Sequence, residues 1–148
     1  MNRKGVDRLL NKSKTLPKRS EIPDQYKWKL EDIYADDAEW EKDAAKVKEL
    51  IEQVKHKQGT LSQSGKHLLE VLQLQDELSM LVEQLYVYAR MRRDEDNTNS
   101  TYQALSDRAT SLSIQVNSAL AYIQPEILAI PDEQLRQLLQ SEPGLDHY

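Results

Sequence analysis

The sequence predicts an all-α fold, an antiparallel bundle of three long helices followed by one short carboxy-terminal helix. Leucine is the commonest apolar residue and phenylalanine is absent, a composition that favours helix over sheet. Three long segments carry apolar residues in alternating steps of three and four, which is the period of one helix face. With 148 residues, of which 39% are hydrophobic and 30% charged, we expect one domain with enough apolar content for a core.

The segment before the first helix is expected to be extended or turning. Pro17 and Pro23 lie too close together for a helix between them, so this interpretation covers residues 16–27. Several aromatic and aliphatic side chains are concentrated in and just after it, and we expect them to pack across the helices as part of the core. They are Tyr26, Trp28, Leu30, Ile33 and Tyr34.

The first long helix is predicted over residues 37–57. Asp36 stands at the N-cap position and Glu39 three residues later, which is the spacing of a capping box. One face is apolar, and Gly59 is expected to end the element. The apolar face consists of Trp40, Ala44, Val47, Ile51 and Val54.

The second long helix is predicted over residues 66–93, after the break at Ser62, Ser64 and Gly65. It carries two neighbouring apolar stripes, so it must be covered on two sides and is expected to be the central helix of the bundle. Leu78 and Leu85 lie a heptad apart on the first stripe and should face both other long helices.

The third long helix is predicted over residues 99–123, ending before Pro125. Between the second and third helices the sequence changes sign abruptly, from arginines to acids and amides. Cations are favourable at the carboxyl end of a helix and acids or amides at the amino end of the next, so a tight helical hairpin explains the change.

The remaining chain is predicted to form one short helix over residues 132–140, with Leu135, Leu138 and Leu139 on one face. Beyond it, Gly144, Leu145 and Tyr148 are expected to form no closing element, as in the front portion of a longer sequence.

Composition limits the functional classes. The net charge of -5 argues against binding to nucleic acid or to an anionic membrane surface. The absence of cysteine excludes disulfides and thiolate chemistry. Residues 1–15 form a basic stretch that is expected to be a flexible arm, without the apolar run of a secretory signal. No stretch approaches the ~20 apolar residues of a membrane span. We therefore expect a cytoplasmic protein.

No catalytic, cofactor-binding or metal-binding residue is expected in this chain. Residues 59–67 resemble a phosphate loop, but five residues separate the glycines and His67 replaces the Ser or Thr that binds magnesium. None of the three histidines, His56, His67 and His147, lies four residues from another with Glu between them, and the pair of His67 with Glu70 is interpreted as solvated. The sequence also lacks the Gly-x-Ser-x-Gly motif of serine hydrolases.

One polar cluster has enough donors and acceptors to bind a ligand. It extends from Arg90 to Asp96 and includes Arg92 and Glu95. The favoured interpretation is two capped helix ends in solvent, because that accounts for every residue.

Three phrases carry a resemblance to a known family: "LPKRSEIPDQYKWKLEDIYADDAEWEKD", "LYVYARMRRDEDNTNSTYQALSDRA" and "YIQPEILAIPDEQL". Together they are similar to the opening of oligoendopeptidase F, in the thimet-oligopeptidase group of zinc metallopeptidases. The likeness covers residues 16–139. It implies that residues 16–148 are a helical amino-terminal domain that packs over a carboxy-terminal zinc domain and walls a channel for short peptides.

None of that family's catalytic or zinc-binding residues maps onto this sequence. The resemblance therefore implies zinc and peptidase activity for a longer enzyme, whose catalytic domain and oligopeptide substrates would be the partners of this chain. The chain alone is expected to be inactive and to expose apolar surface through which it can self-associate. The alternative is a free-standing helical interaction module whose exposed stripe receives a partner helix.

Overall fold

Within residues 17 and 19–148, which the computed structural model describes, the chain forms α-helices, short 3-10 helices and no strand. The predicted all-α class is confirmed. The predicted arm, residues 1–15, lies outside the described residues. The α-helices are α2 (Asp37–Lys55), α3 (Gly65–Glu95), α4 (Ser100–Leu120), α5 (Ile123–Leu128) and α6 (Asp132–Ser141).

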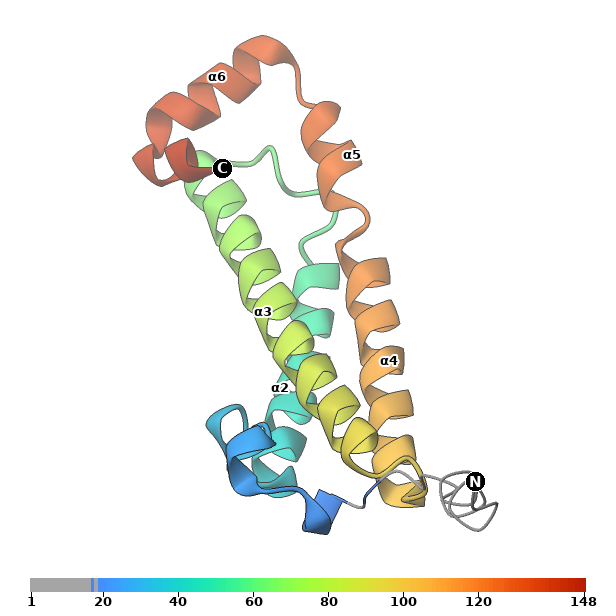
Figure 1. Cartoon of the computed structure of the whole chain (residues 1–148). Coiled ribbons are helices and arrows are strands. Elements are labelled where there is room, and N and C mark those ends of the chain that lie inside the picture. The colour runs from blue at the N-terminus through green and yellow to red at the C-terminus, as the bar shows by residue number, and fades with distance from the viewer. Residues whose placement is uncertain (1–16, 18) are drawn as a thin grey trace, which may run out of the picture.

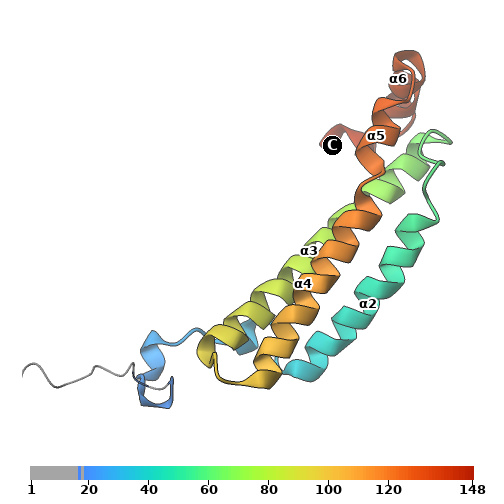
Figure 2. The same cartoon turned by 90° about the vertical axis from the view of Figure 1, so that its right-hand side faces the viewer.

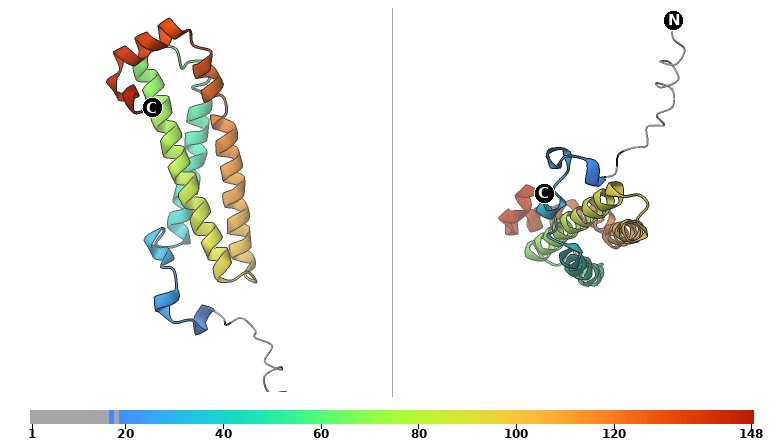
Figure 3. Two further views of the ribbon diagram at one scale, coloured as in Figure 1. Left: turned by 45° about the horizontal axis from the view of Figure 1, so that its top comes forward. Right: turned by 60° about the horizontal axis from the view of Figure 1, so that its bottom comes forward.

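The three long helices α2, α3 and α4 run up, down and up as an antiparallel bundle (Figures 1 and 2). Each contacts the other two, and α3 also contacts α6. At ~1.5 Å per residue, the 31 residues of α3 extend about 46 Å, and Figure 3 shows this helix alongside α2 and α4. It also packs against the 3-10 helices Leu30–Asp32 and Pro143–His147, in agreement with its predicted central position.

Local side chains fix where the long helices begin. The Asp36 carboxylate accepts from the backbone N–H groups of Ala38 and Glu39, and the Asn99 side chain accepts from those at the start of α4. Ser64 caps α3 in the same way. Each cap satisfies N–H groups that have no partner within the helix, at a typical gain of ~1 kcal/mol.

The core lies along the seam where the three long helices meet. Trp40, Leu78, Leu85 and Tyr88 are fully or almost fully buried there. Leu78 and Leu85 have no solvent exposure, as their heptad spacing predicted. Burial of this kind stabilises a domain by ~25 cal/mol per Å² of apolar surface.

The prediction for the aromatic segment before α2 is wrong for two of its residues. Trp28 is 76% exposed and Tyr26 73% exposed, although Leu30 and Tyr34 are buried and Ile33 is partly buried. The segment forms short 3-10 helices, Arg19–Glu21, Asp24–Tyr26 and Leu30–Asp32, at the lower end of the bundle in Figure 1. Leu30–Asp32 packs against α3 and Arg19 pairs with Glu95 of that helix, whereas the rings of Tyr26 and Trp28 remain in solvent.

Two further differences lie at the other end of the bundle. The third helix ends at Leu120 rather than at residue 123, and a separate helix, α5, contains Pro125. The tail was also predicted to form no closing element, but Pro143–His147 is a 3-10 helix that buries Leu145 against α3. The Tyr148 hydroxyl donates to the Asp76 carboxylate over 2.6 Å.

Candidate functional site

The charged cluster at the α3–α4 hairpin is the first candidate, because the sequence singled it out. We call Arg19, Asp37, Arg92 and Glu95 the hairpin cluster. The Arg92 guanidinium lies 3.2 Å from Glu95 Oε2 and 3.6 Å from Asp37 Oδ1. It also stands over two aromatic rings, with its carbon 4.8 Å from the centre of Tyr102 and 5.9 Å from that of Tyr88.

The hairpin cluster is only partly in solvent. The Glu95 side chain is 12% exposed and the Arg92 side chain 27% exposed, and Glu95 also pairs with Arg19 over 2.5 Å. The predicted pair of capped helix ends in solvent is therefore wrong for Arg92 and Glu95. The reason is tertiary: Arg19 and the start of α2 pack against the hairpin and cover these two side chains.

The hairpin cluster acts as a clamp, that is, its ion pairs and ring contacts hold three helices together. Arg92 joins Asp37 of α2 to Glu95 of α3 and the Tyr102 ring of α4. The Tyr88 hydroxyl donates to Asp37 over 2.8 Å, and burial together with this bond raises the pKa of Tyr88 to about 12. Because Arg92 and Glu95 already contact one another and these neighbours, the cluster has a structural role that explains its composition.

The loop that resembles a phosphate loop is closed by a carboxylate of the chain itself. Glu126, on α5, accepts from the backbone N–H of Gly59 over 2.8 Å and of Leu61 over 2.9 Å. Gly59 has φ of +81°, a conformation that glycine adopts without strain. These N–H groups are the kind that a phosphate loop would present to a nucleotide, so the geometry agrees with the sequence argument against nucleotide binding.

His67 and Glu70 lie together without forming a metal site. Their side chains approach to 4.0 Å, and His67 Nε2 hydrogen-bonds to the Thr60 hydroxyl over 2.7 Å. His67 is half-buried rather than freely solvated. Among the described residues, no three His, Cys, Asp or Glu side chains are grouped to hold a metal ion. That the chain binds no metal stays a prediction.

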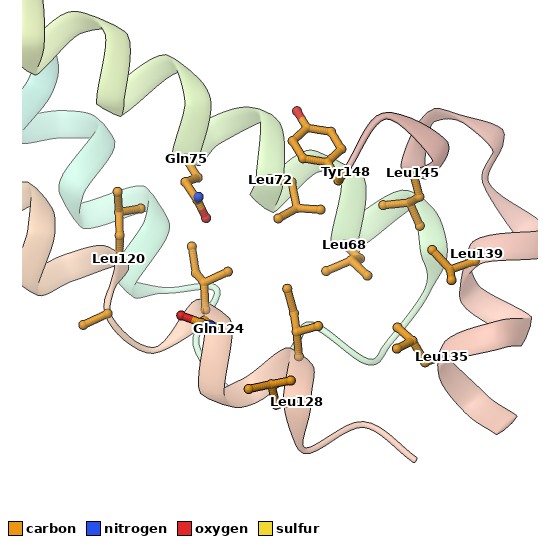
Figure 4. A pocket seen from close by; sticks show the side chains of 13 residues that line it. Leu68, Leu72, Gln75, Leu120, Gln124, Leu128, Leu135, Leu139, Leu145 and Tyr148 are labelled. Carbon is orange, nitrogen blue, oxygen red and sulfur yellow. The ribbon is translucent and has the colours of Figure 1, made fainter. Parts of the chain in front are cut away.

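An apolar pocket of about 670 Å³ lies where the first turns of α3 face α5 and α6, and we call it the leucine pocket (Figure 4). Figure 4 shows side chains from these elements and from the tail around one open space. Its lining includes Leu68, Leu72, Leu128, Leu135, Leu139 and Leu145. Sequence reasoning missed this pocket. The leucine face of α6 was the available signal, but its partners are about sixty residues earlier in the chain.

In the described part of the chain, no helix has the length and apolar character needed to cross a membrane.

Comparison with known proteins indicates which enzymes this chain is related to. No family model matches the chain. The chain is 42% identical to oligopeptidase PepF of Bacillus subtilis over 137 residues, which is 93% of this chain and 20% of that protein. The chain is homologous to part of oligoendopeptidase F. The resemblance predicted from the three sequence phrases is thereby confirmed.

Two further matches agree. The group B oligopeptidase PepB of Streptococcus agalactiae is 32% identical over 130 residues, 88% of this chain and 22% of its own length. The crystal structure of oligoendopeptidase-F from Enterococcus faecium superposes with a TM-score of 0.68 at 34% identity, covering 76% of this chain and 22% of that chain. The chain thus spans about one fifth of the length of these relatives. A match to part of a peptidase does not favour the free-standing interaction module.

Proposed function

We propose that this chain is the amino-terminal helical domain of an oligoendopeptidase F-type zinc metallopeptidase that hydrolyses short peptides in the cytoplasm. One observation carries the proposal: 93% of the chain aligns at 42% identity with only 20% of oligopeptidase PepF of Bacillus subtilis. Identity of this extent over almost the whole chain supports a shared domain, and the small share of the relative supports a role as one part of the enzyme.

The proposed role of the domain is to form a wall of the substrate channel, with residues 16–148 as its extent. A long rigid bundle suits this role, since α2, α3 and α4 share one continuous core. Rigid helices hold a boundary in place more accurately than loops do.

Zinc does not fit the described residues of this chain. A catalytic zinc site needs about three protein ligands, and the His67–Glu70 pair offers two side chains 4.0 Å apart, with His67 Nε2 already bonded to Thr60. We therefore assign zinc to the part of the enzyme that this chain does not match, and no catalytic step to the residues described here.

The proposal is tested by a chimera. The segment of Bacillus subtilis PepF that aligns with this chain is replaced by this sequence, and a second protein simply lacks the segment. We expect the chimera to cleave a fluorogenic oligopeptide and the deletion protein to have lost that activity. The isolated chain should neither cleave the peptide nor retain zinc after dialysis. A folded chimera without activity, or an isolated chain that cleaves the peptide, would contradict the proposal.

A further inference from the structure

We infer that the leucine pocket is an interdomain docking site, which receives an uncharged apolar segment from the part of the peptidase that this chain does not match. The inference rests on the proposed function, since it names the surface through which this domain joins the rest of the enzyme. Three features of the pocket support this role: an uncharged lining, exposed leucine side chains and a match to a much longer protein.

The lining excludes a charged occupant. None of the 13 side chains around the leucine pocket is charged, whereas 30% of the residues in the whole chain are charged. A charge placed there would lose its hydration without gaining an opposite charge. The polar groups of the lining are the amides of Gln75 and Gln124 and the hydroxyl of Tyr148, which already donates to Asp76. The fitting occupant is therefore made of aliphatic or aromatic side chains.

The leucine pocket leaves large apolar side chains in water. Leu128 is 77% exposed and Leu139 is 40% exposed, although Leu68 and Leu145 beside them are buried. Its volume of about 670 Å³ lies within the range of ~300–1,000 Å³ in which proteins bind ligands and partner side chains. Covering this surface would gain free energy at ~25 cal/mol per Å², so an apolar partner has a driving force to dock.

The homologous structure indicates where such a partner comes from. In oligoendopeptidase-F from Enterococcus faecium the matching fold occupies 22% of the chain, so a domain of this shape exists there beside a much longer polypeptide. Interfaces between domains of one chain typically bury ~600–1,500 Å². The leucine pocket, at about 670 Å³, is larger than the hollows of about 300, 440 and 400 Å³ elsewhere on the described residues, which makes it the best candidate for that contact.

A peptide substrate suits the lining less well than a fixed segment does. Peptides of varied sequence are bound mainly through their backbone N–H and C=O groups, which requires a row of hydrogen-bonding partners. Gln75 and Gln124 are two amides in a lining that is otherwise aliphatic apart from Tyr148. A segment of constant sequence needs only complementary apolar shape, and this is what the leucines provide.

The test compares two surface substitutions in the isolated chain and in the chimera. Leu128→Glu puts a charge at the mouth of the leucine pocket. Ile114→Glu is the matched control, because Ile114 is 64% exposed on α4 and lies outside the pocket lining. Both side chains are in solvent, so in the isolated chain we expect the two variants to melt at the same temperature as the unsubstituted chain.

In the chimera the two substitutions should separate. We expect Leu128→Glu to lower the melting temperature or to split the melt into two transitions, and Ile114→Glu to leave it unchanged. The dye ANS, which fluoresces on apolar surfaces, should bind the isolated chain and lose most of that signal in the chimera. Leu128→Glu should restore dye binding in the chimera, since the covering segment would be displaced.

Each other outcome overturns the inference. Equal melting of both chimera variants would show that the leucine pocket is not an interdomain contact. A raised KM for apolar peptides with unchanged melting would assign the pocket to substrate. A dimer of the isolated chain that Leu128→Glu dissociates, without any effect in the chimera, would assign it to a second copy. The melting comparison needs no activity, so loss of peptide cleavage by the unsubstituted chimera would count against the proposed function alone.

Discussion

The indole N–H of Trp40 donates to the backbone carbonyl of Leu85 over 2.9 Å, joining α2 to α3 inside the core. The two residues are 45 positions apart and both side chains have no solvent exposure. Because Leu85 belongs to the central helix, this bond fixes the register between the first two helices of the bundle. A buried tryptophan needs such a partner for its polar edge.

Trp40→Phe should destabilise the chain by ~1–3 kcal/mol, because it removes the donor to a buried carbonyl and leaves space beside it. Trp28→Phe is the matched control: the Trp28 side chain is 76% exposed, and we expect a change below ~0.5 kcal/mol. Urea titration of both variants measures the difference. An equal loss for the two substitutions would mean that the Trp40 bond does not contribute.

Sequence patterns predicted the helices well because the signals that start a helix are local. Asp36, Ser64 and Asn99 each cap N–H groups within three residues of themselves, so their effect can be read from a short window. The predicted starts at residues 37, 66 and 99 differ by at most one residue from the observed starts.

The features that sequence reasoning missed depend on residues far apart in the chain. The break between α4 and α5 is accompanied by the Tyr122 hydroxyl, which donates to the Val54 carbonyl 68 positions earlier. The covering of Glu95 depends on Arg19, which no periodic pattern links to the hairpin. The leucine pocket combines α3 with α6 in the same way. Such contacts require the tertiary arrangement and not only helix periodicity.

Leu78→Ala and Leu85→Ala should each cost ~2–5 kcal/mol, because both delete buried methyl groups and leave a cavity. Both side chains are completely buried on α3. Leu128→Ala serves as the control, since Leu128 is mostly in solvent in this chain. Urea titration gives the order directly if unfolding is two-state. A Leu128→Ala loss as large as either core substitution would contradict the described packing.

Stability should fall as the pH rises from about 10 to about 12. Burial, with a hydrogen bond to Asp37, raises the pKa of Tyr88 to about 12, and burial also raises the pKa of Tyr122 to about 12. An unfolded tyrosine has a pKa of ~10. Below that pH the protonated hydroxyls contribute fully, and the contribution is lost as the pH approaches the folded value.

The pH dependence can be assigned by substitution. In Tyr88→Phe the loss of stability between pH ~10 and 12 should be shallower, since one of these hydroxyls has been removed. Tyr26→Phe is the control, because its ring is 73% exposed. Denaturant titrations at several pH values, with tyrosine ionisation followed by absorbance, provide the measurement. Identical slopes for the two variants would show that Tyr88 does not carry the effect.

Glu126→Gln should loosen the loop between α2 and α3 by ~1–2 kcal/mol. The carboxylate accepts from two N–H groups, those of Gly59 and Leu61, with one oxygen each. A glutamine replaces one of those oxygens by a donor, which leaves an N–H without its acceptor. We expect faster amide hydrogen exchange at Gly59 and Leu61. Glu133→Gln, at an exposed position on α6, should leave both exchange rates unchanged.

For the hairpin cluster, the solvent exposure predicted from the sequence differs from the contacts that the structure shows. If Arg92 were a cation at a solvated helix end, Arg92→Ala would cost under ~1 kcal/mol. The structure instead places its guanidinium 3.2 Å from Glu95 and 4.8 Å from the centre of the Tyr102 ring, with the side chain 27% exposed. Charge-assisted bonds and stacking on an aromatic face each contribute ~0.5–2 kcal/mol when partly desolvated.

Arg92→Ala should therefore destabilise the chain by ~1–3 kcal/mol, since it also leaves the nearly buried Glu95 with one cation fewer. Arg90→Ala is the matched control, because Arg90 lies on the same helix end and its exposed guanidinium donates to the Tyr86 hydroxyl. Its loss should be much smaller than that of Arg92→Ala, because an exposed charge in solvent contributes little to stability. Arg92→Lys should be intermediate, because it keeps the charge but not the planar group that stacks on Tyr102. Equal urea midpoints for the Arg92→Ala and Arg90→Ala variants would show that the hairpin consists of two solvated helix ends. Arg92 would then not stabilise the contact between α2, α3 and α4.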